Sequence, residues 1–124
     1  MHNSYKSLKY FIKSKKQSNR PLKVSSVIHN LIANIIINNQ VYLPNINVNR
    51  ITIYEVLMSS DLRYANIYLV ILGDDVDYEE QLKIINNHAS EFRYIIGKKM
   101  RQMRYIPELR FYNKRKINSS YISL

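Results

Sequence analysis

Apolar residues recur every three to four positions from Leu22 onwards, which is the period of a helix with one buried side. Arg20-Pro21 is a suitable helix start, because proline is tolerated in a first turn. The pair Asn38-Asn39 supplies a stop. The sequence therefore predicts a helix to about Asn38, with these apolar positions: Val24, Val27, Ile28, Leu31, Ile32, Ile35 and Ile36.

After a loop around Pro44, the apolar positions indicate two strands. Val48–Ser59 is rich in β-branched residues, and Tyr64–Leu72 alternates with a period of two. The polar segment Ser59-Ser60-Asp61 separates them, so we predict a β-hairpin. One face of the second strand would carry Ala65, Ile67, Leu69 and Ile71.

The last third of the chain returns to helical spacing. Asp77 is a suitable N-cap for a helix from Tyr78 to about Asn87, with Glu80 at the capping-box position. Asn86–Ser90 interrupts the pattern, because Asn and Ser compete for backbone hydrogen bonds. A further helix would then run to about Met103, with an apolar side made of Phe92, Ile95, Ile96, Met100 and Met103.

Pro107 opens a predicted final strand, Glu108–Tyr112. The resulting order α-β-β-α-α-β indicates an α+β fold, with helices packed on one face of a small antiparallel or mixed sheet. A chain of 124 residues is long enough for one domain with a single core.

The distribution of charge along the chain indicates a class of partner. The net charge is +10, and 16 of the 19 Lys and Arg residues lie in 1–23 or 93–116. Such clusters favour phosphate-rich or other anionic partners. Tyr94 and Tyr105 interleave with the second cluster and would stack on unpaired bases or pack beside the core. The expected RNA-binding residues are Arg93, Lys98, Lys99, Arg101, Arg104, Arg20, Lys23 and Arg110.

Catalysis is not expected from these residues. The chain has no cysteine, three dispersed histidines and two glycines, so it lacks a thiol site and a glycine-rich phosphate loop. His29 has no ligand partner at metal-binding spacing, and the acids of 74–80 suit a turn and a helix start. We therefore expect no enzyme activity, no cofactor and no metal. No apolar run reaches the ~18 residues of a membrane span, and we expect a cytoplasmic monomer.

Three segments are expected along the chain. Residues 1–19 form a basic leader that we expect to be flexible, the alternative being a short amphipathic helix on an anionic membrane. Residues 20–116 form the domain, and 117–124 form a short tail.

Four segments in order resemble the ribosome-binding factor A family from Arg20 on. They are Arg20–Val24, Met58–Val70 with its Ser-x-Asp-Leu turn and Tyr-Ala pair, Ile95–Arg101 with Gly-Lys, and Ile106–Phe111 with Pro-Glu-Leu. The resemblance implies a type II KH-like domain with a three-stranded sheet. It also implies a non-catalytic assembly factor that binds small-subunit 16S rRNA or its precursor during late maturation.

The same resemblance implies a kink between the last two helices, marked in the family by Ala-x-Gly. The matching residues here are Ala89, Ser90 and Glu91, so glutamate replaces the glycine. Glu91 resists a positive φ and would suit the first turn of the following helix, with Ser90 as its N-cap. The alternative function is a basic protein-interaction module that binds an acidic partner, with RNA binding incidental.

Overall fold

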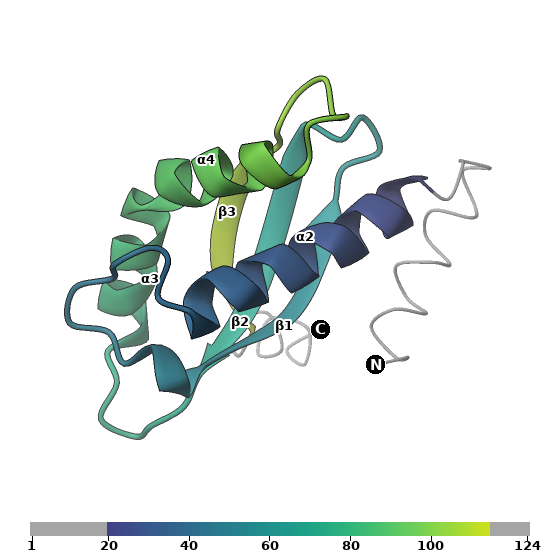
Figure 1. Cartoon of the computed structure of the whole chain (residues 1–124). Helices are drawn as coiled ribbons and strands as arrows, with labels where there is room; N and C mark the ends of the chain where they lie inside the picture. The colour runs from purple at the N-terminus through teal and green to yellow at the C-terminus, as the bar shows by residue number, and fades with distance from the viewer. Residues whose placement is uncertain (1–19, 115–124) are drawn as a thin grey trace, which may run out of the picture.

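The computed structural model describes residues 20–114, so the expectations for the leader at 1–19 and the tail at 117–124 lie outside it. The described elements follow the predicted order, with the helices on one face of a three-stranded sheet (Figure 1). None of these helices combines the length and hydrophobicity needed to cross a membrane. The elements are α2 (Arg20–Ile37), η1 (Val48–Arg50), β1 (Ile51–Met58), β2 (Tyr64–Ile71), α3 (Tyr78–Asn87), α4 (Ala89–Lys99) and β3 (Glu108–Asn113).

The sheet is mixed, with β2 in the centre. β2 pairs antiparallel with β1, which confirms the hairpin, and parallel with β3. The register shifts between Ile53 and Glu55, so β1 carries a bulge at Tyr54. The inward set predicted for β2 is buried to 1% exposure or less, which confirms the period-two pattern: Ala65, Ile67, Leu69 and Ile71.

The hairpin turn is held by its own polar side chains. The Ser59 hydroxyl donates to Asp61 Oδ1 at 2.7 Å and accepts from the Tyr64 amide at 3.0 Å. The Arg63 amide donates to Asp61 Oδ1 at 3.1 Å. The Ser59 hydrogen bond, followed by that from Arg63, lowers the pKa of Asp61. These groups shape the turn.

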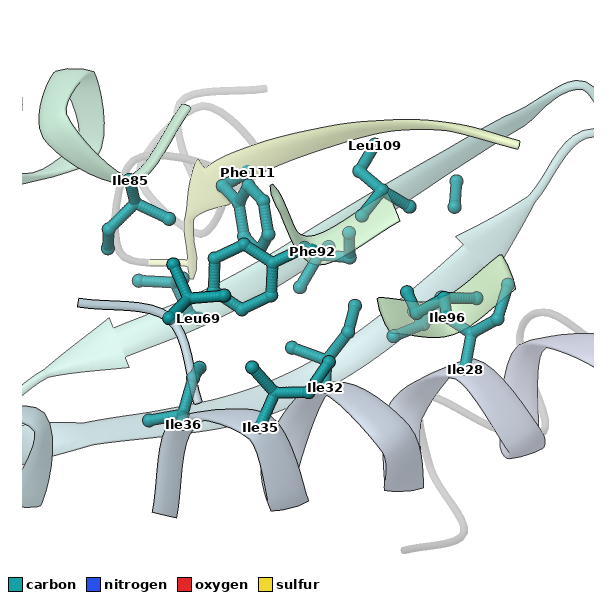
Figure 2. Packing of buried hydrophobic residues seen from close by; sticks show 14 of the residues in the cluster. Ile28, Ile32, Ile35, Ile36, Leu69, Ile85, Phe92, Ile96, Leu109 and Phe111 are labelled. Atoms are coloured by element: carbon teal, nitrogen blue, oxygen red, sulfur yellow. The ribbon is translucent and has the colours of Figure 1, made fainter. Parts of the chain in front are cut away.

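The core lies between α2, α4 and the inner face of the sheet (Figure 2). Ile28 and Ile32 of α2 and Ile96 of α4 are fully buried. Phe92 of α4 packs against Phe111 of β3, with ring centroids 5.3 Å apart and planes tilted by 52°. This aromatic contact fixes α4 to the edge strand.

Two predicted boundaries were wrong. Residues 48–50 form a 3-10 turn rather than the start of a strand, because the Asn47 side chain accepts a hydrogen bond from the Asn49 amide. α4 ends at Lys99 rather than near Met103, because Met100 leaves helical geometry at φ −118° and ψ 61°. Met100 and Met103 still contact the core, so the apolar pattern continues beyond the helix.

The break between α3 and α4 falls at His88, whose backbone has φ −104° and ψ 12°. Its Nδ1 lies 2.8 Å from the carbonyl oxygen of Ile84. The expected kink residues Ala89, Ser90 and Glu91 are instead the first turn of α4, and Ser90 is not the N-cap. The Glu91 amide bonds to the His88 carbonyl at 3.0 Å, so Glu91 continues a helix as its type favours.

Asn86 connects the end of α3 to the edge strand. Its Oδ1 accepts from the Phe111 amide at 2.9 Å, and its Nδ2 donates to the Phe111 carbonyl at 3.0 Å. The side chain therefore satisfies both backbone groups of Phe111. The sequence indicated Asn86 only as a helix interruption, because nothing in its neighbours points to a partner 25 positions away.

Candidate nucleic-acid interface

The two sides of α4 differ in chemistry. Phe92 and Ile96 are buried four residues apart, and Met100 continues their line just beyond the helix. The opposite side borders an open groove of about 530 Å³ between α4 and the connection to β3. The groove has no carboxylate in its lining, which consists of Ser90, Arg93, Tyr94, Gly97, Lys98, Arg101 and Ile106.

Arg93 builds the wall of this groove. Its Nε donates to the Pro107 carbonyl at 3.0 Å, and its Nη2 donates to the Ile106 carbonyl at 2.8 Å. These charge-assisted bonds hold the connection against α4, while the guanidinium keeps its positive charge. Arg93 is therefore a positioning residue as well as a cation.

The remaining cations of this region are exposed. Lys98 Nζ lies 4.7 Å from the centre of the Tyr94 ring. Lys98 and Lys99 end α4, where cations complement the helix dipole, so their position also favours the helix itself. Arg101 and Arg104 gain no such benefit, because they lie in the connection after the helix. They are exposed, and no ion pair involves them within residues 20–114.

The tyrosines of this region are exposed rather than packed in the core. Tyr94 and Tyr105 each retain 66% of their accessible surface. Of the two alternatives that the sequence left open, the structure therefore favours rings available for contact with another molecule.

The other predicted RNA-binding residues occupy separate positions. Arg20 and Lys23 are exposed on the first turn of α2, which lies at the same end of the domain as the end of α4 (Figure 1). Arg110 lies on the outer face of the sheet, between the inward residues Leu109 and Phe111 of β3. Its Nη2 is 3.3 Å from Glu108 Oε1, and hydrogen bonds to Tyr112 and Glu108 raise its pKa. The structure thus groups Arg93, Lys98 and Arg101 and separates Arg110 from them.

Two residues of the acidic segment, Asp75 and Asp77, have structural roles. Asp77 Oδ1 accepts from the Glu80 amide at 3.2 Å and caps α3, and Asp75 pairs with Arg50 at 3.2 Å. His29 is half-buried, and burial lowers its pKa. Within residues 20–114, no three His, Asp or Glu side chains are grouped in a way that would hold a metal ion.

The fold defines the class of protein. The elements follow the order α-β-β-α-α-β, with α3 and α4 between β2 and β3 in the chain and β3 parallel to the central β2. This arrangement is that of a KH-like domain. A Thermotoga maritima protein described as a ribosome-binding factor A has a solution structure similar to this one, with a TM-score of 0.65 and 30% identity. The match covers 75% of this chain and 85% of that protein. The fold of ribosome-binding factor A from Thermus thermophilus is also similar, with a TM-score of 0.61 at 17% identity over 77% and 97% of the two chains.

The chain belongs to the ribosome-binding factor A family. The model of that family, described as "Ribosome-binding factor A", matches residues 20–121. The Paracoccus denitrificans ribosome-binding factor A is 35% identical over 94 residues, which are 76% of this chain and 67% of that protein. The Rhizobium meliloti protein of the same name is 35% identical over 76% of this chain and 69% of its own length. These comparisons confirm both the predicted family and the predicted fold.

Proposed function

We propose that this protein is a non-catalytic assembly factor that binds small-subunit rRNA through the α4 groove during late subunit maturation. The observation that carries the proposal is the charge of the groove lining: its three charged residues are all cations, and they lie with the exposed ring of Tyr94. Membership of a family named for ribosome binding supports the partner. Lys and Arg at such a surface bind phosphates and release counterions.

Several cations act together in this proposal. Lys98 and Arg101 line the groove. Lys99 and Arg104 lie close to them in the sequence. Arg20 and Lys23 lie on the first turn of α2, at the same end of the domain (Figure 1). Arg93 fixes the wall of the groove by donating to the backbone carbonyls of Ile106 and Pro107. Recognition then depends largely on phosphate position and RNA shape.

The test is a titration of the protein with a small-subunit rRNA fragment at several salt concentrations. We expect the pair Lys98→Gln and Arg101→Gln to lower affinity about tenfold or more and to flatten the salt dependence by roughly one to two phosphate contacts. The matched control is Arg110→Gln with Lys114→Gln, which removes the same charge from the outer sheet face and should change neither quantity.

Two results would contradict the proposal. Equal losses in the groove pair and the control pair would show that net charge alone drives binding. Failure of the wild-type chain to co-sediment with small subunits, combined with tight binding to an acidic protein, would favour the interaction-module alternative.

A further inference from the structure

Gly97 is a glycine that the fold itself does not require. It lies inside α4, where glycine is less favourable than alanine. A Cβ added there would lie 3.4 Å from Ile106 Cγ1, an ordinary contact, whereas at Gly73 the same atom would lie 2.6 Å from Arg50 Nη1. Gly73 also has φ +129°, a conformation that side chains resist. Only Gly73 is explained by the chain's own structure.

The place of Gly97 suggests another reason for its bare backbone. It lines the groove together with Arg93, Tyr94 and Lys98. A glycine on a helix surface allows another chain to approach the helix backbone closely.

The break before α4 is poorly suited to the same contact. KH domains commonly clamp the nucleic-acid backbone with a glycine-containing loop between two helices. Here the break is formed by His88, and the Glu91 carboxylate lies 3.8 Å from His88 Nε2. A carboxylate at this position repels a phosphate, and no glycine allows close approach.

We infer that the sugar–phosphate backbone of an unpaired RNA strand crosses α4 at Gly97, rather than at the break around His88. The phosphates lie between Arg93 and Lys98, and a base stacks on Tyr94. An unpaired strand is required, because a base inside a duplex does not expose its face to a tyrosine ring. This inference rests on the proposed function and adds the form of the RNA and its path.

The decisive variants change one residue at each of the two alternative sites. Gly97→Leu fills the groove floor, and Asn87→Leu replaces an exposed amide at the end of α3, next to the break, with an apolar side chain of similar size. Gly97→Ala is the milder version, and we expect it to raise the thermal unfolding temperature. Each full-length variant is titrated with a uridine-rich single strand and with a blunt duplex of equal length.

We expect wild-type protein to bind the single strand at least about tenfold more tightly than the duplex. The reason is that only the unpaired strand can stack a base on Tyr94. Gly97→Leu should remove most of that preference, Gly97→Ala should reduce it, and Asn87→Leu should leave it within about twofold.

Three results would overturn the inference while leaving the proposed function intact. They are equal binding of single strand and duplex, unchanged single-strand binding in folded Gly97→Leu, or a larger loss in Asn87→Leu. Absence of RNA binding by the wild-type protein would instead contradict the proposed function itself.

Discussion

Two surfaces of this domain combine tyrosines with cations, and they differ in their acids. The outer sheet face carries Arg110, whose guanidinium lies 4.9 Å above the Tyr64 ring and next to Glu108. Lys114 Nζ lies 4.2 Å above the Tyr54 ring and interacts with the Glu55 carboxylate. The lining of the α4 groove contains cations and Tyr94 but no carboxylate.

Residue type alone does not mark a phosphate-binding surface. On the sheet face, the positive charges are balanced by Glu55 and Glu108, and two rings, Tyr68 and Tyr112, stack on each other at 5.4 Å. In the groove, the field of Lys98 and Arg101 is not cancelled locally, so an incoming phosphate meets net positive potential. The surface without acids is therefore the candidate for RNA.

The largest expected effect comes from the core that supports both surfaces. Phe92 lies on the inner side of α4 and packs on Phe111 under the sheet face. Phe92→Ala should lower the free energy of unfolding by about 3–5 kcal/mol, because it removes a fully buried ring and leaves a cavity. Denaturant unfolding measures the loss, and Phe92→Leu should cost less. A loss below about 1 kcal/mol would contradict the packing on which the comparison of the two surfaces depends.

Substitution of Arg93 should have the next largest effect. Comparing it with Lys98 distinguishes the structural role of the groove wall from the role of the groove's positive charge. Arg93→Ala removes two hydrogen bonds to the Ile106 and Pro107 carbonyls. It should reduce stability by about 1.5–3 kcal/mol and also weaken RNA binding. Lys98→Ala should weaken binding with little change in stability, because its side chain is exposed. Calorimetry and RNA titration of the two variants check this; equal stability of both would exclude the positioning role of Arg93.

Much of the fold could be predicted from the local pattern of apolar residues. Met100 shows what that pattern does not predict. The period of two in β2 and the period of 3.6 in α2 each report a real buried face. Met100 and Met103 continue the helical spacing of Phe92 and Ile96, but the chain leaves the helix at Met100 and still directs both methionines to the core. The period of the apolar residues predicts which side chains are buried, but it does not predict where the helix ends.

The site was only partly predictable, for a different reason. The sequence placed Arg93 among the expected RNA-binding residues, but its partners are carbonyl oxygens 13 and 14 positions away. It also grouped Arg110 with the groove cations on charge clustering alone, although the period of two in β3 places Arg110 on the face opposite Leu109 and Phe111. Long-range geometry determined the role of Arg93, and a local signal was available for Arg110.

Exposed tyrosines provide a direct comparison of the two surfaces. Tyr94→Ala should weaken single-stranded RNA binding by about 1–3 kcal/mol, the usual range for a stacked base. Tyr54→Ala, at a half-exposed ring on the sheet face, should leave binding unchanged. Tyr94→Phe retains the ring and should bind nearly as well as wild type. Equal losses for Tyr94→Ala and Tyr54→Ala in the same titration would remove the distinction between the two faces.

The smallest effect is expected at Glu55, the half-buried acid of the sheet face. Burial raises its pKa above the ordinary 4.5, and the charge of Lys114 opposes the shift. An acid with a raised folded-state pKa contributes stability that is present below the unfolded pKa and lost as pH rises through the folded one. Glu55→Gln should therefore stabilise the protein at pH 7, and this gain should fade as pH falls towards 4.5. Urea unfolding at the two pH values measures it.

The same variant also tests where RNA binds. Removing the Glu55 charge makes the sheet face, with its neighbours Lys114, Tyr68 and Tyr112, more attractive to phosphate. Because the groove is the proposed site and lies on α4, RNA affinity at pH 7 should be the same in Glu55→Gln as in wild type. A several-fold gain in affinity that disappears on adding Arg110→Gln would assign the RNA to the sheet face instead, since the gain would then depend on a cation of that face.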